Sequence, residues 1–485
     1  MDDLRRAALW LALVGAVTAI VGVVGLRFYT RFAPLYLQPP SIILIVVDTL
    51  RADYLGCYGF EGDISPRIDE LAAESVLFEN CSSQAPWTTP SLASMMTSLL
   101  PQAHGVALSS EAPRDYQTWR REWTPAVPDV TNTLAEILRG QGYRTGAFVA
   151  NPFLTRDLGF EQGFEVFDAS AAKKKDRDAP AVLEPAGLWL DTVLRARHPF
   201  FLYLHLMDVH GPYSSPEGDF NAIRESPGLG EARNLTVQQF DRIQPYLRRP
   251  QWTRRAHGKE LRTWRGRYAA GVHAADRHLG HLLRRLREEE RWQNTLVVLT
   301  ADHGEELFDH GGWDHGFSLH RHQLHVPLLI RFPGAERGGT RVSDVVRLVD
   351  ILPTLAEIAE AGVPSTAVGT DLAPLTRLAA GVEPPRAVFA SSIKSRPGRS
   401  SMTVGRYKLI ADADGGKARL FDLVTDPGER LDIAPVRPDV VRELQVRLLD
   451  ELMKIAATAP EASAAIELPA EQVEQLRELG YVPEN

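Results

Sequence analysis

Three side chains that can bind a metal ion follow two apolar runs of this sequence. Asp48 ends the β-branched run at residues 41–48, and Asp302 and His303 follow a second run at residues 295–301. Two carboxylates and an imidazole can bind one divalent cation and leave positions open for a substrate. The alternative is that each acid only caps a neighbouring helix. Two acids with His303 beside them favour the metal.

Thr88 is the candidate nucleophile. It lies in the segment Thr88-Thr89-Pro90-Ser91, in which Pro90 suits the first turn of a helix. A helix N-terminus is electropositive and attracts an anionic ester. A hydroxyl bound to a metal there can lose its proton and attack the ester. We therefore predict that Thr88 is both a metal ligand and the nucleophile; the alternative is that Thr88 or Thr89 is only the N-cap.

Histidines supply the remaining candidates. His210 follows the predicted strand at 200–207, and His315 lies in residues 309–325, which contain four further histidines. This histidine-rich run is close in sequence to Asp302. It suggests anion binding and proton donation, or a second metal, and the spacing does not decide between them.

A single sheet would position these residues. Apolar strand-like runs alternate with helical segments, which predicts an α/β fold with a doubly wound, mostly parallel sheet flanked by helices. Ligands bind at the carboxyl ends of the strands in such sheets. The predicted strands are residues 41–48, 143–150, 200–207, 295–301 and 326–332, and the predicted helices are residues 66–75, 89–100, 133–141 and 268–291.

Two other parts of the chain are predicted to differ from this pattern. Residues 169–185 are charged and contain proline, which predicts an exposed loop. From residue 384 strand-like segments and an amphipathic helix at 436–455 predict a smaller C-terminal α+β subdomain. The catalytic domain is accordingly predicted at 41–383 and the C-terminal subdomain with its tail at 384–485.

The N-terminus is predicted to anchor the chain in a membrane. Residues 7–26 contain no charged side chain, and this length can cross a bilayer as one helix. We expect residues 1–6 on the cytoplasmic side and a linker at 27–40; a cleaved signal peptide is the alternative. Arginines flank the span on both sides, so their count does not fix its orientation.

Composition narrows the function classes. The chain has 485 residues with 44% hydrophobic side chains, enough for a large core, and its net charge of −8 argues against nucleic acid as a partner. Cys57 and Cys81 are the only cysteines, and they can form a disulfide or remain buried thiols.

Together these segments resemble the sulfatase family of the alkaline phosphatase superfamily, from residue 41 to about residue 429. The resemblance implies the fold, one divalent metal and hydrolysis or transfer of a sulfate or phosphate ester. The matching motifs are VVDTLRADYLGCYG (46–59), WTTPSLASMMTSLLPQAHG (87–105), HLMDVHGPY (205–213), TADHGEELFDHGGWDHG (300–316), YKLI (407–410) and LFDLVTDPGE (420–429).

The resemblance also implies roles for particular residues. Asp48, Asp302 and His303 match metal ligands, and Thr88 stands where sulfatases carry the Cys or Ser that becomes formylglycine. His210 matches a substrate-binding histidine. His315 stands at a Lys or His that contacts the anionic group or the leaving oxygen of the ester.

This chain also departs from the sulfatase pattern. Leu92 replaces an arginine, and a Lys and a His of the family are missing at 148–151, where Asn151 can take over part of their role. In having a threonine as nucleophile, this chain resembles the phosphoethanolamine and phosphoglycerol transferases of the superfamily. Those are membrane-anchored with an extracytoplasmic catalytic domain, on the periplasmic side of the inner membrane in bacteria, and we expect the same here.

We therefore predict a sulfatase-like, metal-dependent hydrolase with Thr88 as nucleophile. The imidazole ligand favours Mn or Zn, with Ca or Mg possible. The expected substrate is an anionic ester, a sulfated or phosphorylated glycan or lipid. A membrane-anchored phosphotransferase and a catalytically inactive ligand-binding protein are the two alternatives.

Overall fold

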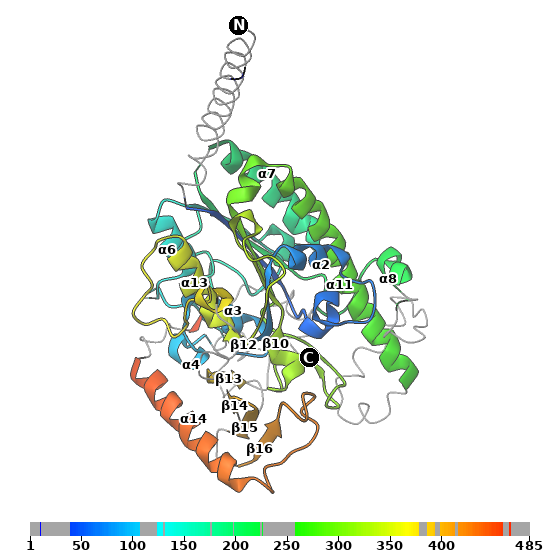
Figure 1. The fold of residues 1–485 in the computed structure, drawn as a ribbon, viewed down its shortest axis with the longest axis vertical. Helices are drawn as coiled ribbons and strands as arrows, with labels where there is room; N and C mark the ends of the chain where they lie inside the picture. Colours follow the sequence, from blue (N-terminus) through cyan, green and yellow to red (C-terminus); the bar gives the residue numbers. More distant parts are fainter. Residues whose placement is uncertain are drawn as a thin grey trace.

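A nine-stranded sheet forms the centre of the molecule, and a separate four-stranded sheet lies near its C-terminal end (Figure 1). Both are seen in a computed structural model. It describes residue 10 and residues 39–106, 124–129, 131–174, 177–196, 198–223, 226, 258–377, 386–392, 398–412, 416–458 and 465–466.

The large sheet is mostly parallel. Its strand order is β5-β4-β6-β1-β7-β11-β2-β10, with β12 paired to β2. The five strands from β5 to β7 run parallel, whereas β11 is antiparallel to both β7 and β2. The strands are β1 (Ser41–Val47), β2 (Val76–Ser82), β4 (Arg144–Val149), β5 (Val166–Asp168), β6 (Phe200–Leu206), β7 (Thr295–Thr300), β10 (His325–Val326), β11 (Leu328–Arg331) and β12 (Arg341–Arg347).

The central strands explain why the functional side chains meet. Every residue of β1, β6 and β7 is buried, as expected for parallel strands covered on both faces. Val46 of β1 lies level with His205 of β6 and with Thr300 of β7. Residues that directly follow these three strands therefore project from one edge of the sheet.

Helices cover both faces of the large sheet. On one side lie α2 (Pro66–Ala73), α7 (Ala179–Ala196) and α11 (Gly258–Arg287), and on the other lie α3 (Thr88–Thr97), α6 (Leu134–Gly140) and α13 (Ile351–Ile358) (Figure 1). The predicted α/β architecture, a mostly parallel sheet with helices, is confirmed.

The second sheet is antiparallel and belongs to the C-terminal part of the chain. Leu409 and Leu420 of this sheet pack with Leu444 and Leu448 of helix α14 in a small apolar cluster. The predicted boundary at residues 383 and 384 stays a prediction. The elements are β13 (Val388–Ser392), β14 (Arg399–Val404), β15 (Tyr407–Asp412), β16 (Ala418–Asp422) and α14 (Pro438–Thr458).

Three predicted segments were wrong in detail. The expected loop at 169–185 is a short 3-10 helix followed by the start of α7, because apolar residues at helical spacing, such as Val182 and Leu190, are buried and outweigh Pro185 inside the helix. The expected strand at 326–332 is two strands, β10 and β11, and β11 ends the parallel run. The long helix begins at Gly258, ten residues before the prediction.

The two cysteines form no disulfide. Cys57 is half-buried and Cys81 is buried, and both are free thiols. Of the two alternatives that the sequence allows, the structure therefore has the unbonded one.

The predicted membrane anchor, residues 7–26, lies outside the described residues apart from Trp10. Within the part of the chain that is described, no helix has both the length and the apolar character needed to cross a bilayer.

Candidate active site

Two buried carboxylates lie side by side at the carboxyl edge of the large sheet. Asp48 follows β1 and Asp302 follows β7, and neither is exposed. One oxygen of each is held in place: Asp302 Oδ1 accepts hydrogen bonds from the backbone amides of Thr49 (3.2 Å) and His303 (2.9 Å), and Asp48 Oδ2 accepts one from Asn151 Nδ2 (2.7 Å). The other two oxygens, Asp48 Oδ1 and Asp302 Oδ2, accept no hydrogen bond from the described part of the chain.

His303 adds an imidazole nitrogen to this pair. Its Nδ1 lies 2.8 Å from the carbonyl oxygen of Gly304 and must donate to it. Its Nε2 lies 3.4 Å from Asp302 Oδ2 and 3.7 Å from Asp48 Oδ1. The three ligand atoms lie within 4.8 Å of one another. We call Asp48, Asp302 and His303 the strand-end cluster.

The chemistry of the strand-end cluster fits a divalent cation. Burial, and secondarily the charge of Asp302, raises the pKa of Asp48 well above its usual range, and burial raises the pKa of Asp302 to about 7. Two adjacent buried carboxylates are costly without a positive charge. A cation between their unbonded oxygens would remove that cost and complete the donor set.

Thr88 lies directly against the strand-end cluster. It is the first residue of α3, and its Oγ1 is 3.3 Å from His303 Nε2 and 3.4 Å from Asn151 Nδ2. The N-cap of α3 is Trp87, so the alternative that Thr88 or Thr89 serves as the N-cap is wrong.

Two contacts fix the surroundings of Thr88. Ser91 Oγ donates to the carbonyl oxygen of Asp302 at 2.5 Å, which ties the first turn of α3 to the end of β7. Asn151 Oδ1 accepts from the backbone amide of Phe153 at 2.9 Å. This bond sets the orientation of the Asn151 side chain, so that its Nδ2 donates toward Asp48 and faces Thr88.

His315 and His210 extend the site from His303. The ring centroids of His303 and His315 are 4.5 Å apart, and those of His315 and His210 are 5.1 Å apart. His315 Nδ1 lies 3.2 Å from Glu305 Oε1 and 3.1 Å from Asp314 Oδ1, which fixes its ring. Burial and the charge of Asp314 raise the pKa of Glu305 well above its usual range.

His210 lies in the wall of a cavity of about 340 Å³. The cavity wall also contains Arg177, Ser214 and Ser215. Thr88 and the three cluster residues are fully enclosed, whereas His210 borders this open space. A substrate seated there would meet His210 and Arg177, and also the carboxyl groups of Asp178 and Asp208.

All seven candidate residues from the sequence thus lie in one neighbourhood, and their roles stay predictions. His205, which is not among the predicted site residues, lies with its Nε2 3.8 Å from Asp48 Oδ2. Neither ring nitrogen of His205 has a hydrogen-bond partner among the described residues, and burial lowers its pKa to about 3. The available signal was a histidine inside the apolar strand FFLYLHL. Glu305 was also missed, although it follows Asp302 and His303 closely.

Two family models match this chain. The model described as Sulfatase matches residues 40–361, and the model described as N-sulphoglucosamine sulphohydrolase, C-terminal, matches residues 308–458.

Individual proteins are similar over most of the chain. Arylsulfatase K of Canis lupus familiaris is 26% identical over 477 residues, covering 88% of this chain and 84% of the relative. Delta 4,5-hexuronate-2-O-sulfatase of Bacteroides thetaiotaomicron is 24% identical over 428 residues, covering 82% of this chain and 85% of the relative. The crystal structure of phosphonate monoester hydrolase of Agrobacterium radiobacter has the same fold, with a TM-score of 0.66 at 20% identity, covering 87% of this chain and 96% of that one.

Proposed function

Because this chain belongs to the sulfatase family of the alkaline phosphatase superfamily, we propose that it is a metal-dependent hydrolase of sulfate or phosphate-type esters with Thr88 as its nucleophile. The family and the class of sulfatase-type ester hydrolase are the ones predicted from the sequence, and both are confirmed. One observation carries the finer proposal: Thr88 Oγ1 lies 3.3 Å from His303 Nε2, beside two buried carboxylates that each have an unbonded oxygen.

The strand-end cluster would hold the ion, with Thr88 as the fourth protein ligand. A bound divalent cation lowers the pKa of a coordinated hydroxyl and offsets negative charge on the transferred group. Mn or Zn suits a donor set with an imidazole better than Ca, which prefers an all-oxygen shell.

The residues around Thr88 prepare it for attack. Asn151 Nδ2 faces its oxygen, and the N-terminus of α3 places positive electrostatic potential where the anionic ester must sit. Thr88 Oγ1 would form a bond to the sulfur or phosphorus atom. The bond between that atom and the ester oxygen would break, which leaves a sulfo- or phospho-threonine.

A histidine would donate a proton to the departing oxygen. We assign this step to His315, because Glu305 and Asp314 hold its Nδ1 and fix the ring beside His303. His210 borders the cavity and would bind the anionic group. Water would then hydrolyse the ester on Thr88 and release sulfate or phosphate.

The substrate class follows from charge and from the relatives. Arg177 and His210 lie in the cavity wall together with Asp178 and Asp208, so the bound ion and the N-terminus of α3 would supply the attraction for an anionic group. A relative is named as a hexuronate-2-O-sulfatase, which supports a sulfated glycan for this chain. A phosphorylated glycan or lipid has the same charge chemistry and remains in the proposal.

A substrate panel tests the proposal. Full-length protein, and a variant that starts at residue 39, would be assayed on aryl sulfate, phosphomonoester, phosphodiester and phosphonate monoester substrates with Mn, Zn, Ca or Mg. We expect turnover of at least one ester, its loss in Thr88→Ala, and partial recovery in Thr88→Ser.

The products distinguish the alternatives. Free sulfate or phosphate indicates a hydrolase, and transfer of the group to an added glycan or lipid acceptor indicates the phosphotransferase. Binding of an ester with no turnover under any metal would contradict the proposal and favour the ligand-binding protein.

A further inference from the structure

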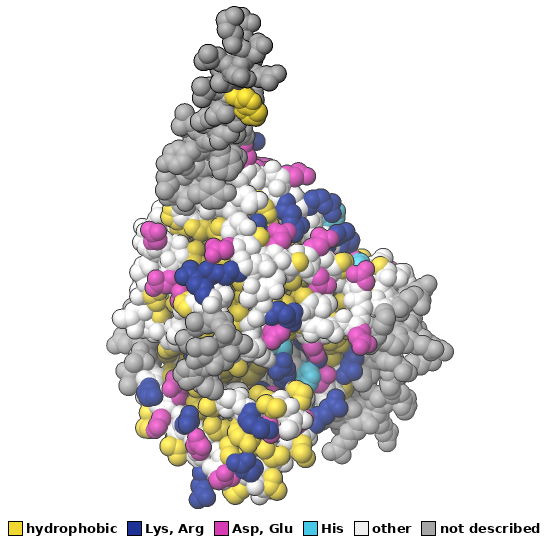
Figure 2. Space-filling model, in the orientation of Figure 1, with side chains coloured by type: hydrophobic (Ala, Val, Ile, Leu, Met, Phe, Trp, Pro, Cys, Tyr) yellow, Lys and Arg dark blue, Asp and Glu magenta, His cyan; other side chains and the backbone are white. Residues whose placement is uncertain are grey.

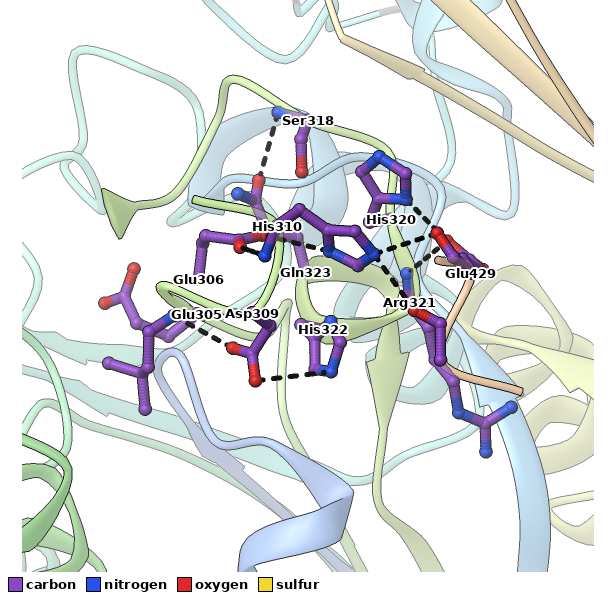
Figure 3. Close-up of polar contacts among 12 residues, drawn as sticks. Glu305, Glu306, Asp309, His310, Ser318, His320, Arg321, His322, Gln323 and Glu429 are labelled. Carbon is purple, nitrogen blue, oxygen red and sulfur yellow. Dashed lines mark hydrogen bonds and ion pairs between the residues drawn. The ribbon is translucent and has the colours of Figure 1, made fainter. Parts of the chain in front are cut away.

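A second group of acid and histidine side chains follows the strand-end cluster in the chain. It comprises Glu306, His310 and His322, which we call the hairpin cluster (Figure 3). Glu306 belongs to the short hairpin formed by β8 (Glu306–Leu307) and β9 (Trp313–Asp314), and His322 lies in the short helix α12 (Arg321–Leu324). Its three ligand atoms lie within 4.8 Å of one another. In the space-filling view, histidine and basic side chains reach the surface near the position of β10 in Figure 1 (Figure 2).

Glu306 offers one unbonded oxygen to this group. The side chain is buried, with 2% of its surface exposed. Its Oε1 accepts a hydrogen bond from the backbone amide of His310 at 2.5 Å. Its Oε2 has no hydrogen-bond partner among the described residues. A buried carboxylate oxygen without a donor is unfavourable unless a cation faces it.

His310 offers an unbonded nitrogen next to it. Its Nε2 lies 3.0 Å from the carbonyl oxygen of Gly428 and 3.1 Å from that of Glu429. Carbonyl oxygens only accept, so Nε2 carries the proton and Nδ1 of the neutral ring has its lone pair available. Nδ1 is buried, has no partner in the described structure, and lies 3.8 Å from Glu306 Oε2, too far for a hydrogen bond.

His322 repeats this arrangement. Its Nε2 lies 3.5 Å from Asp309 Oδ1, and its Nδ1 is buried with no hydrogen-bond partner in the described chain. Asp309 is itself held by Arg51, whose guanidinium lies 2.7 Å from Asp309 Oδ2. A carboxylate that holds the far nitrogen of a metal-binding histidine is the usual outer partner in such sites.

We propose that the hairpin cluster is a second metal site that binds one Zn²⁺ through Glu306 Oε2, His310 Nδ1 and His322 Nδ1. Each ligand lies about 2 Å from a zinc ion, so ligand atoms around one ion lie roughly 3 to 4 Å apart. Two imidazoles and one carboxylate are a zinc donor set that leaves the fourth position to water.

In a neighbouring group of acid and histidine side chains, a lysine takes the place that a metal ion would have. Glu429 accepts from Lys408 Nζ at Oε1 (2.7 Å) and from His320 Nδ1 at Oε2 (2.8 Å). The ammonium group of Lys408 already supplies the positive charge there. His320 is therefore the matched control residue, because it lies beside His310 with ring centroids 3.7 Å apart but has its Nδ1 bonded.

The position of the site gives the ion a structural role. The hairpin of β8 and β9 leads directly into His315, and Glu306 stands next to Glu305, which holds His315 Nδ1. Arg51 connects Asp309 to the segment that follows Asp48. An ion bound by the hairpin cluster would thus fix the segment that carries His315 without touching the substrate.

Metal content tests the proposal on the full-length chain. The protein would be loaded with Zn²⁺ and freed of excess ion, and its zinc content per chain would be measured by elemental mass spectrometry. We expect two zinc ions per chain in the unaltered protein, and one in His322→Gln or Glu306→Gln. The control His320→Gln should keep two. Asp302→Asn should retain one zinc ion, the one in the hairpin cluster. The double variant with Asp302→Asn and His322→Gln should retain none.

Two further measurements complement the metal content of these variants, and the first uses only the unaltered protein. Anomalous diffraction at the zinc edge from the unaltered protein should show an ion between His310 and His322. In Asp309→Asn the zinc dissociation constant of this site should rise by about 10- to 100-fold.

The proposal is overturned if His322→Gln binds as much zinc as the unaltered protein. It is equally overturned if zinc-saturated crystals show no ion there while nitrogen NMR finds His310 doubly protonated, because the cluster is then an ion pair. Neither outcome affects the role of Thr88, which is judged by turnover of its own variants.

Discussion

The strand-end cluster and the hairpin cluster use the same construction for different purposes. In both, a hydrogen bond or a carboxylate holds one atom of each side chain. Both also contain a buried carboxylate oxygen without a hydrogen bond in the described structure, Asp48 Oδ1 and Asp302 Oδ2 in the first and Glu306 Oε2 in the second. The strand-end cluster, however, lies at the carboxyl ends of β1 and β7 against the N-terminus of α3, with Thr88 beside it. The hairpin cluster faces backbone carbonyls and Asp309.

Under the two proposals, a metal donor set alone does not make an active site. A nucleophile within reach of the ion, an electropositive helix end and histidines beside an open cavity are the additional requirements. If Thr88 is the nucleophile as proposed, the strand-end cluster would combine them, since Thr88 begins α3 and lies against His303, and His210 borders the cavity.

Removing a ligand from the strand-end cluster should abolish most activity. We expect Asp302→Asn to lower kcat/KM by about 10³-fold or more, because a charge that offsets the transferred group is lost with the ion. Steady-state kinetics with parallel metal analysis would show both losses. If Glu306→Gln causes an equal loss of activity, the proposed division between the clusters is wrong.

Replacing the proton donor should have the next largest effect. His315→Gln should lower kcat by about 10²-fold on alkyl esters. The loss should be much smaller on aryl esters, whose leaving group needs no proton. Equal losses on both substrate types would contradict proton donation by His315 and point to a role in positioning.

Metal removal should destabilise the protein in a pH-dependent way. Burial raises the pKa of Asp302 to about 7 in the ion-free protein, so the folded state binds more protons than the unfolded state between about pH 4 and pH 7. Stability of the stripped protein therefore falls as pH rises through this range.

Thermal unfolding with and without a chelator measures this effect. The chelator should lower Tm by roughly 5 °C or more near pH 8 and by much less near pH 5. In Asp302→Asn the pH dependence should be weaker. If the chelator lowers Tm equally at both pH values, the ion does not stabilise the fold by offsetting the negative charge of the buried carboxylates.

Disrupting the hairpin cluster should have the smallest effect on catalysis. We expect His322→Gln to change kcat/KM by less than about fivefold and to lower Tm by roughly 2 to 4 °C, the size of a modest structural loss. His320→Gln serves as the comparison for damage to the same region. A loss of activity as large as that of Asp302→Asn would place the hairpin cluster in the reaction itself.

The sequence predicted the strand ends well, for a physical reason. Buried parallel strands are continuous apolar runs, so the acids that end them stand out, and the sheet then places Asp48 and Asp302 side by side. Asn151 was found because it stands where the family carries other polar residues, and the structure places it on Asp48 and near Thr88.

The histidine-rich run could not be divided in the same way. His315 joins the strand-end neighbourhood, His320 pairs with Glu429, and His325 Nε2 contacts the carbonyl oxygen of Glu79. Glu305 and Asp309 contact His315 and His322 from nearby in the chain, whereas the partners of His320 and His325 are 109 and 246 residues away. Local spacing has no access to those partners. The same limit explains why part of α7 was predicted as a loop. The burial of its apolar side chains depends on distant parts of the fold and outweighs the effect of its proline and charges.

The most direct test of the central claim is to trap the covalent group on Thr88. Protein turning over its best ester would be quenched in acid at successive short times, digested and analysed by mass spectrometry. The account predicts that one sulfo or phospho group appears on Thr88 before steady state and is missing in Thr88→Ala. Full turnover by Thr88→Ala, with no modified Thr88 in the unaltered protein at any time, would contradict it.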